Sequence, residues 1–392
     1  MSRLKILFLE QYSQISGGQK CLLELIDGLD QSCYECYLAL PDAGELLDEI
    51  QKRGIKYFIL PIGKYSLGRK NFLDVLGFMV RNLFLVFLLI RLIRKYRFDL
   101  IYANAPRTFV FGTFAAKICG IPILWHLHII IGGIERRICR IMMGIGVSKV
   151  IVVSNTVKRV LIKPGEKLEE KIDVVYNGID ASKFNIVFED DKFRKEIGVA
   201  RDCNLIGYIG RIAAGKGIED LILAAEKVIE EVPNTKLLIV GAELFNLGKH
   251  SYKDELVALI KALGLMNCFI FTGGRKDIAN ILASIDVLVV PSRAPESFGL
   301  VVLEGMASGK VVIASNQGGP AEIIKDGFDG ILFEPRNHNE LSAKLIKLLR
   351  TADEIKMIGK NARRTVLERY TVNNYRKKIE RNILDAVNKR RG

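Results

Sequence analysis

The sequence predicts an α/β protein made of two facing, doubly wound parallel-sheet domains. Three observations support this fold class. The chain has 392 residues, more than one hydrophobic core of ordinary size accommodates. Short apolar runs alternate with helical patterns along the chain, as in parallel sheets that carry helices on both faces. The alternation occurs once in each half of the sequence, so each half is expected to form its own sheet.

The first half begins with the apolar run 4–9, which predicts a strand. A loop with two glycines follows, and then a helical pattern near 19–29. A long apolar segment, 72–95, predicts a second helix. Further strands are expected at 36–40, 57–60, 100–102, 121–128 and 150–153.

The second half repeats this pattern with shorter elements. Strands are expected at 205–209, 236–240, 268–271, 287–290, 311–314 and 330–333. Helices are expected between and after them, at 218–231, 252–263, 276–284, 299–308, 320–325 and 338–349.

The domain boundary is expected near 177–200, where the turn pair Asn177-Gly178 precedes an acidic, polar stretch. We therefore predict a first domain at 1–185 and a second at 186–370. The basic tail 371–392 has a helical pattern and is a candidate to pack back on the first domain. Ligands of such sheets bind at the carboxyl ends of the strands, so the cleft between the two domains is the expected site.

The seven cysteines are odd in number and irregularly spaced, and no secretory signal precedes them. This pattern favours a cytoplasmic protein whose cysteines are small core residues. Cys33 and Cys36 form a C-x-x-C pair, but no second pair or nearby histidine completes a set of metal ligands. We expect no metal and no bound cofactor.

The net charge of +14 is concentrated in one segment. Residues 52–107 contain twelve Lys and Arg but only two acids. Within this segment, residues 72–97 combine an apolar run too short to cross a bilayer with a basic end, which suits the surface of an anionic membrane. A core helix packed on a sheet is the alternative. No helix-turn-helix and no aromatic-basic platform is present, so nucleic acid is not an expected partner.

Two loops that follow predicted strands have the composition of anion sites. Gly17 and Gly18 lie between the first strand and its helix, where backbone N–H groups can approach a phosphate. The full G-x-G-x-x-G is absent, which disfavours a nicotinamide dehydrogenase. In the loop 210–217, Arg211 and Lys216 can each bind one phosphate group, although both could also be solvated surface cations.

Two further pairs of polar residues are candidates for chemistry. His126 and His128 alternate at the end of a predicted strand, so they share one face. No third ligand lies near them, which argues against zinc. Glu296 lies in a loop, and Glu304 interrupts an apolar helix that begins near Phe298-Gly299-Leu300. A loop acid and a helix acid with this spacing can hold two hydroxyl-bearing ends of one extended ligand, such as a nucleotide sugar, while the helix N-terminus attracts its anionic part.

The segment Glu296-Ser-Phe-Gly-Leu-Val-Val-Leu-Glu304 resembles the E-x7-E motif of retaining GT-B glycosyltransferases of family 4. Gly318-Gly319-Pro320, Asp326-Gly327 and Gly330 follow in that family's order. The resemblance spans nearly the whole chain, is strong at 206–333 and weakens at 44–99. Gln19 departs from the acidic or Arg variants that are frequent after the first glycine pair.

The resemblance implies two Rossmann-like domains and a cytoplasmic, metal-independent transferase that acts in cell-surface polysaccharide or glycolipid synthesis. A nucleotide sugar would be the donor, and a sugar or lipid-linked sugar the acceptor. Arg211 and Lys216 would hold the diphosphate, and Glu304 the ribose. Glu296 and the amides of Phe298, Gly299 and Leu300 would hold the donor sugar, with Gly17 and Gly18 also lining the donor site.

The residues expected to act in the reaction itself are His128, near the reacting sugar, with Glu296, Arg211 and Lys216. Glu296 is expected to position the sugar, while the departing phosphate accepts the proton. Two alternatives remain open, namely a sugar-nucleotide epimerase of the same architecture and a non-catalytic, membrane-associated protein that binds sugar nucleotides.

Overall fold

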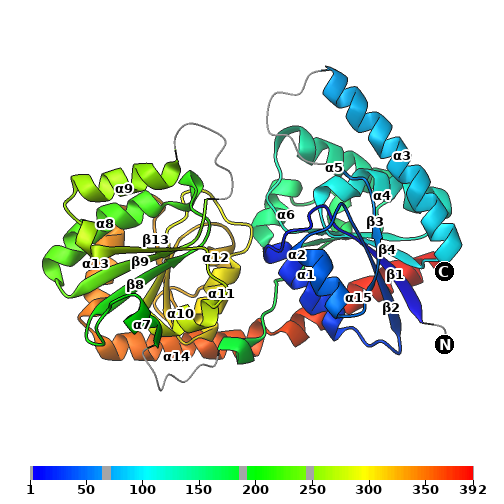
Figure 1. Ribbon diagram of the computed structural model, residues 1–392. Helices are drawn as coiled ribbons and strands as arrows, with labels where there is room; N and C mark the ends of the chain where they lie inside the picture. Colours follow the sequence, from blue (N-terminus) through cyan, green and yellow to red (C-terminus); the bar gives the residue numbers. More distant parts are fainter. Residues whose placement is uncertain (1–2, 64–71, 185–191, 244–250, 392) are drawn as a thin grey trace. The chain divides into compact units, whose positions relative to one another are not determined.

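The structure is a computed structural model that describes residues 3–63, 72–184, 192–243 and 251–391 (Figure 1). The chain divides into two compact units. The first contains Met1–Gly178 together with Val372–Gly392, and the second contains Ile179–Thr371. The predicted boundary between residues 185 and 186 lies outside the described residues, as does the acidic stretch 189–191.

The described part of the first unit contains a parallel sheet of seven strands in the order β3-β2-β1-β4-β5-β6-β7. Its central strands are buried and, apart from His126 and Lys149, apolar, as expected for strands covered on both faces. The strands are β1 (Leu4–Leu9), β2 (Tyr34–Leu40), β3 (Lys56–Ile59), β4 (Leu100–Ala103), β5 (Ile123–Leu127), β6 (Lys149–Val152) and β7 (Ile172–Val174).

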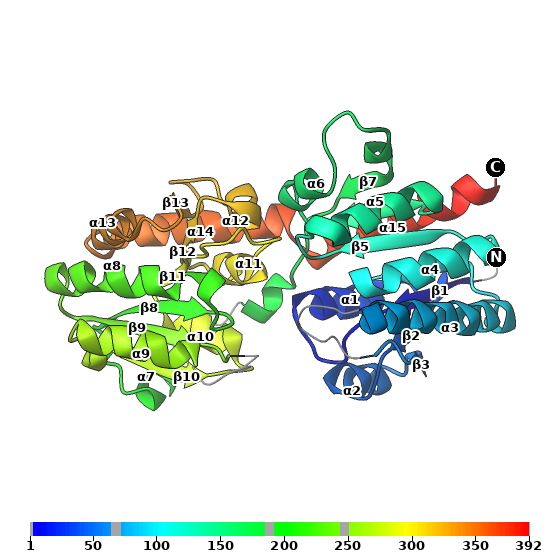
Figure 2. The same ribbon diagram turned by 90° about the horizontal axis from the view of Figure 1, so that it is seen from above.

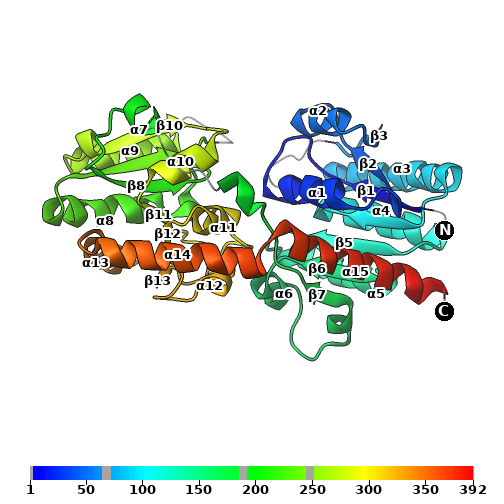
Figure 3. The same ribbon diagram turned by 90° about the horizontal axis from the view of Figure 1, so that it is seen from below.

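Helices cover both faces of this sheet. Helices α3, α4 and α5 lie side by side on one face, and α1 and α15 contact one another on the other (Figures 2 and 3). The helices of this unit are α1 (Gly17–Gly28), α2 (Glu45–Lys52), α3 (Phe72–Tyr96), α4 (Pro106–Cys119), α5 (Gly133–Ile145), α6 (Asn155–Leu161) and α15 (Val372–Arg391). The C-terminal tail is therefore a helix of the first unit.

The described part of the second unit has a parallel sheet of six strands in the order β10-β9-β8-β11-β12-β13. Its strands are β8 (Asn204–Ile209), β9 (Thr235–Val240), β10 (Phe269–Gly273), β11 (Val287–Val290), β12 (Val311–Ser315) and β13 (Ile331–Phe333). Its helices are α7 (Lys192–Glu196), α8 (Ile218–Glu231), α9 (Tyr252–Ala262), α10 (Ile278–Ser284), α11 (Leu300–Ala307), α12 (Gly318–Ile323), α13 (His338–Leu349) and α14 (Ala352–Arg369).

The predicted fold class of two doubly wound parallel sheets is confirmed, with differences in single elements. Strand β5 begins after Pro122, whose missing N–H prevents a ladder bond, and it ends before His128. Helices α2, α4, α5, α6 and α14 and strand β7 are not among the predicted elements. Helix α4, for example, is rich in Phe and Thr, which favour strands when read in isolation.

None of the seven cysteines forms a disulfide, and three of them, Cys21, Cys139 and Cys203, are buried as expected. Cys33 is exposed, so the expectation that every cysteine is a core residue is wrong for it. Its strand β2 begins only at Tyr34, which leaves Cys33 in the preceding turn. Within the described ranges, no helix is long and apolar enough to cross a membrane.

Each sheet has one point at which the direction of winding reverses. In the first unit this point lies between β1 and β4, and in the second it lies between β8 and β11. Successive connections leave in opposite directions there, so the loops at the carboxyl ends of the two strands separate and leave room for a ligand. Gly17 and Gly18 follow β1, Arg211 and Lys216 follow β8, and Glu296 follows β11.

Candidate functional site

Two loops meet at the switch point of the second sheet, one after β8 (residues 210–217) and one after β11 (residues 291–299). Two hydrogen bonds join them, because the N–H groups of Arg293 and Ala294 donate to the Gly215 carbonyl at 3.0 and 3.2 Å. Gly217 has a φ of +68°, and a Cβ there would lie 1.9 Å from the Pro291 carbonyl oxygen. Only glycine allows this close approach of the two backbones.

An ion pair bridges the two loops. Lys216 Nζ lies 2.8 Å from Glu296 Oε1, and both side chains are largely shielded from solvent. The Ser292 hydroxyl donates to the same carboxylate oxygen. Gln317, which precedes α12, also contacts the loop 291–299, since its Nε2 donates to the Ser292 carbonyl at 2.6 Å. The predicted residues Lys216 and Glu296, which are eighty positions apart, are therefore brought together.

A second ion pair, which the sequence does not reveal, anchors the loop 291–299 to α8. Arg293 binds Asp220 in bidentate fashion, with N···O distances of 2.8 and 2.7 Å, and Glu219 lies 3.2 Å away. Asp220 is only 1% exposed, and hydrogen bonding to this carboxylate raises the pKa of Arg293. In the sequence these residues appear only as a loop cation and a first-turn helix acid, so nothing marks them as partners.

The N-terminus of α11 is held in place by close backbone packing. Gly299, with a φ of +96°, precedes the helix, and the Gly319 N–H donates to the Glu296 carbonyl at 2.8 Å. A Cβ on Gly319 would lie 2.1 Å from the Phe298 carbonyl oxygen. The start of α12 therefore packs directly on the backbone at 296–298 and fixes where the helix amides of α11 point.

The remaining predicted residues surround the same switch point. Arg211 follows β8 and is exposed, and the Tyr208 hydroxyl donates to its carbonyl at 2.7 Å. Glu304 is half-buried, one helical turn after Leu300, and so lies on the same face of α11. Two cations, a positively polarised helix end and two carboxylates thus gather at one sheet edge, which suits a ligand with an anionic middle and hydroxylated ends.

The first unit holds the predicted residues Gly17, Gly18, His126 and His128 near its own switch point. Gly17 and Gly18 begin α1, and a Cβ on Gly18 would lie 3.4 Å from the His128 ring. His126 and His128 lie together, with ring centroids 3.9 Å apart. Burial lowers the pKa of His128 to about 4, so the imidazole is neutral at neutral pH.

His128 has a partner that the sequence did not single out. Its Nε2 lies 3.0 Å from Asn104 Oδ1, and Asn104 Nδ2 donates to Glu10 Oε2 at 2.7 Å. Glu10 directly follows β1 and Asn104 directly follows β4, the two strands at the switch point. The sequence signal that could have identified Glu10 and Asn104 is their position, since each is a polar residue immediately after an apolar strand.

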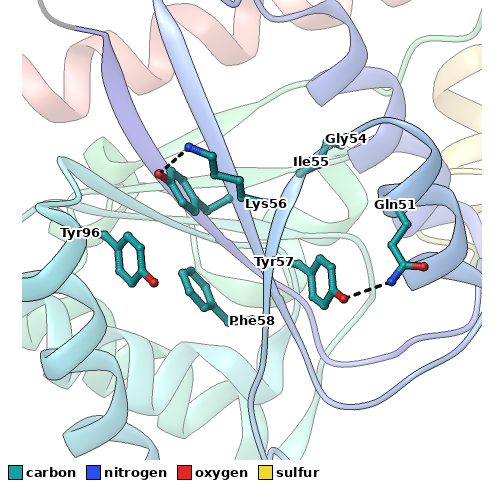
Figure 4. A pocket seen from close by; sticks show the side chains of 8 residues that line it. Gln51, Gly54, Ile55, Lys56, Tyr57, Phe58 and Tyr96 are labelled. Carbon is teal, nitrogen blue, oxygen red and sulfur yellow. Dashed lines mark hydrogen bonds between the residues drawn. The ribbon is translucent and has the colours of Figure 1, made fainter.

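A separate cavity of about 480 Å³ lies near the start of β3 (Figure 4). It is lined by Tyr37, Gln51, Lys56, Tyr57, Phe58 and Tyr96 among others. Because the sheet is parallel, the amino end of β3 is at the opposite edge from Gly18 and His128. This cavity is not part of the candidate site. Among the described residues no group of His, Cys, Asp and Glu side chains is arranged to hold a metal ion.

Two family models match the chain. Residues 189–365 match the family described as glycosyl transferases group 1, and residues 15–183 match glycosyltransferase family 4. An uncharacterized glycosyltransferase of Methanocaldococcus jannaschii is 31% identical over 72% of this chain and 74% of its own length.

Other similar proteins match over almost their full length. An Escherichia coli UDP-Gal:alpha-D-GlcNAc-diphosphoundecaprenol alpha-1,3-galactosyltransferase is 26% identical, with 98% of each chain covered. The crystal structure of Anabaena HepE in complex with UDP-glucose superposes with a TM-score of 0.83 and 27% identity, covering 97% of this chain and 99% of that one.

Proposed function

Because the chain belongs to the glycosyl transferases of group 1, family 4, we propose that it transfers a sugar with retention of the anomeric configuration, without a metal ion, to a lipid-linked acceptor. This reaction would serve cell-surface polysaccharide or glycolipid synthesis. The chain has two Rossmann-like domains of the GT-B fold, and it is a glycosyltransferase that takes a nucleotide-sugar donor.

The observation that carries the proposal is the Lys216–Glu296 pair at the switch point. A lysine that touches the carboxylate on one side can bind the leaving phosphate on the other. The sugar, held by Glu296 and the amides of Phe298, Gly299 and Leu300, then lies beside the diphosphate held by Arg211 and Lys216. Glu304, one turn further along α11, binds the ribose.

Retention follows from attack on the face that the diphosphate leaves. As the bond between the anomeric carbon and the phosphate oxygen breaks, negative charge develops on the diphosphate next to Arg211, Lys216 and the N-terminus of α11. The acceptor hydroxyl attacks the oxocarbenium-like sugar on the same face and gives its proton to the departing phosphate. Because these cations and the helix end neutralise the diphosphate, no metal is required.

The test is transfer from a panel of nucleotide sugars, with UDP-glucose and UDP-galactose first because similar proteins carry these ligands or names. A donor that binds should raise the melting temperature, and NMR of the product in excess EDTA should show the donor's anomeric configuration. An inverted product contradicts retention. Activity that requires an added divalent cation contradicts the metal-independent mechanism.

Peripheral membrane binding is supported by the outer surface of helices α3, α4 and α5. Of the nineteen large apolar side chains that are exposed among the described residues, eleven lie on these three helices. They are Phe78, Met79, Val80, Leu83, Phe84, Phe87, Phe114, Ile118, Ile134, Ile138 and Ile141. Helix α4 lies between α3 and α5 and contacts both (Figure 2). The exposed apolar side chains of these helices are here called the three-helix face, and apolar patches of this kind mark interaction sites.

The positive charge next to the three-helix face favours an anionic bilayer as its partner. Residues 77–97 contain five Lys and Arg and no acid. Apolar side chains that can enter the headgroup region, next to cations that attract anionic lipid, are the signature of interfacial binding. A lipid-linked acceptor would then be presented to the enzyme at the membrane surface, as the name of the Escherichia coli relative also suggests.

We expect the protein to sediment with anionic but not with neutral liposomes, and salt should weaken the binding. The double substitution Leu83→Ser, Phe87→Ser removes two exposed apolar side chains of α3. It should lower the partition coefficient by roughly tenfold or more. Met357→Ser with Leu367→Ser, which changes comparably exposed apolar residues of α14, is the matched control. Equal sedimentation of both double variants contradicts the assignment of the three-helix face.

A further inference from the structure

A row of polar side chains connects the start of α1 to His128. Gln19 Oε1 accepts hydrogen bonds from the Ser16 N–H and hydroxyl at 3.1 and 2.5 Å, and the Gln19 side chain also bonds to Glu10. Glu10 accepts from Asn104 Nδ2, and Asn104 Oδ1 faces His128 Nε2. Ser16, Gln19, Glu10, Asn104 and His128, here called the buried relay, thus link the glycine turn to the imidazole.

The interior of the relay is fully enclosed. Glu10 is 0% exposed, Asn104 3% and Gln19 5%. Burial raises the pKa of Glu10 above its usual value, and four hydrogen-bond donors offset this rise only in part. These donors are Gln11 N–H at 2.6 Å, Tyr12 N–H at 3.4 Å and the two side-chain amides. An apolar side chain could fill this position in a core without any such provision, so the buried and hydrogen-bonded carboxyl group points to a role beyond packing.

The direction of the hydrogen bonds follows from the donors around Glu10. Its Oε1 accepts from the N–H groups of Gln11 and Tyr12, and its Oε2 accepts from the NH₂ group of Asn104. The carbonyl oxygen of Asn104 then faces His128, and an amide oxygen also only accepts. His128 Nε2 must therefore carry the proton, which leaves Nδ1 unprotonated in a neutral ring. The lowered pKa of His128 agrees with a neutral ring.

We propose that Glu10 is a positioning residue that acts through Asn104 to hold neutral His128 in the Nε2–H tautomer, and through Gln19 to hold the glycine turn against the same ring. The relay thereby fixes the positions of Gly17, Gly18 and His128 relative to one another. Its catalytic consequence rests on the proposed transferase function, whereas the tautomer does not depend on it. Gln19, which departs from the family pattern, is accounted for as the link between Ser16 and Glu10.

The sharpest test is the Glu10→Gln variant. The NH₂ group of the introduced glutamine would face Asn104, and Asn104 would have to turn its carbonyl toward it. The NH₂ group of Asn104 would then face His128, which must accept through Nε2 and move its proton to Nδ1. The double variant Glu10→Gln, Asn104→Asp restores the original polarity, because the new carboxylate accepts from both neighbours.

The readout is ¹⁵N NMR of histidine-labelled full-length protein, in which protonated and unprotonated ring nitrogens are resolved. The sequence has four histidines, and His128→Asn assigns the relevant signals. We expect Nε2–H in the wild type, Nδ1–H in Glu10→Gln and Nε2–H again in the double variant. Glu35→Gln, a carboxylate of β2 paired with Lys56, is the control and should leave the tautomer unchanged.

Kinetics give the second readout. Glu10→Gln should lower kcat by roughly 10–100-fold with little change in the donor KM, by analogy with the scale for partners that orient metal-ligating histidines. The double variant should recover most of the loss.

An Nδ1–H tautomer in the wild type, which needs no variant to fold, overturns the proposal, as does an unchanged tautomer in Glu10→Gln. A reversed tautomer with unchanged kcat overturns the catalytic role. Absence of transfer from every nucleotide sugar would instead refute the proposed function and leave the NMR result standing.

Discussion

Replacement of Lys216 by alanine is expected to lower kcat by roughly 10²–10³-fold, the scale for removing one group that stabilises developing charge. Two interactions are lost together. The leaving diphosphate loses a cation, and Glu296 loses its partner at 2.8 Å and keeps only the Ser292 hydroxyl among the bonds described for its carboxylate. Because charge grows on the phosphate as the bond breaks, kcat should fall more than the donor KM rises.

Steady-state kinetics over a range of donor concentrations measure this split. Lys227→Ala removes an exposed lysine of the neighbouring helix α8 and serves as the control for general loss of positive charge. A Lys216→Ala enzyme that turns over within about threefold of the wild type would exclude the assigned role, since such a change is far below the expected scale.

Replacement of Gly319 by alanine is expected to lower kcat/KM for the donor by roughly 10²-fold, the effect of a misplacement of about 1 Å in a catalytic site. The added Cβ would lie 2.1 Å from the Phe298 carbonyl oxygen and 2.3 Å from its Cα. Both atoms belong to the backbone, so the clash cannot be relieved by a rotamer change. Either the start of α12 or the segment 296–298 must move, and with it the N-terminus of α11 and the Glu296 carboxylate.

Gly274→Ala is the matched control, because a Cβ there would meet only the Ala242 side chain at an ordinary 3.7 Å. Thermal unfolding of both variants shows whether Gly319→Ala loses activity as a folded protein. If Gly319→Ala is folded and keeps kcat/KM within a factor of about three, the packing of α12 does not position the donor site.

The positions of strands and helices in the second unit could be predicted closely from the sequence. Short apolar runs bounded by glycine or polar residues identify β8 through β13, since strands buried on both faces need continuous apolar side chains. The charged residues that follow β8 and β11 could also be identified as candidates from local sequence. Arg211, Lys216, Glu296 and Glu304 are charged residues beside buried elements, where charge is unfavourable without a partner.

Helix α3 shows where local pattern is insufficient. Its residues are apolar on all sides, so periodicity leaves a core helix and a membrane-surface helix as equal alternatives. The structure shows that one side of α3 is buried as in a core helix and that the other side is exposed. Leu85, Leu89 and Ile93 are buried against the unit, while Leu83, 71% exposed, and Phe87, 54% exposed, face outward. Which side is covered depends on the neighbouring helix, and no single segment carries that information.

The sequence by itself determined the family, most of the strands, and the residue types at their ends, because these depend on local composition and spacing. The tertiary structure decided which of those residues meet. Lys216 reaches Glu296, Arg293 reaches Asp220 and Glu10 reaches Asn104 across seventy or more residues of chain. These contacts follow from strand order, since a parallel sheet places side by side the carboxyl ends of strands that are distant in sequence. Strand order is set by the packing of the whole sheet and its helices, and it leaves no mark in any one stretch of residues.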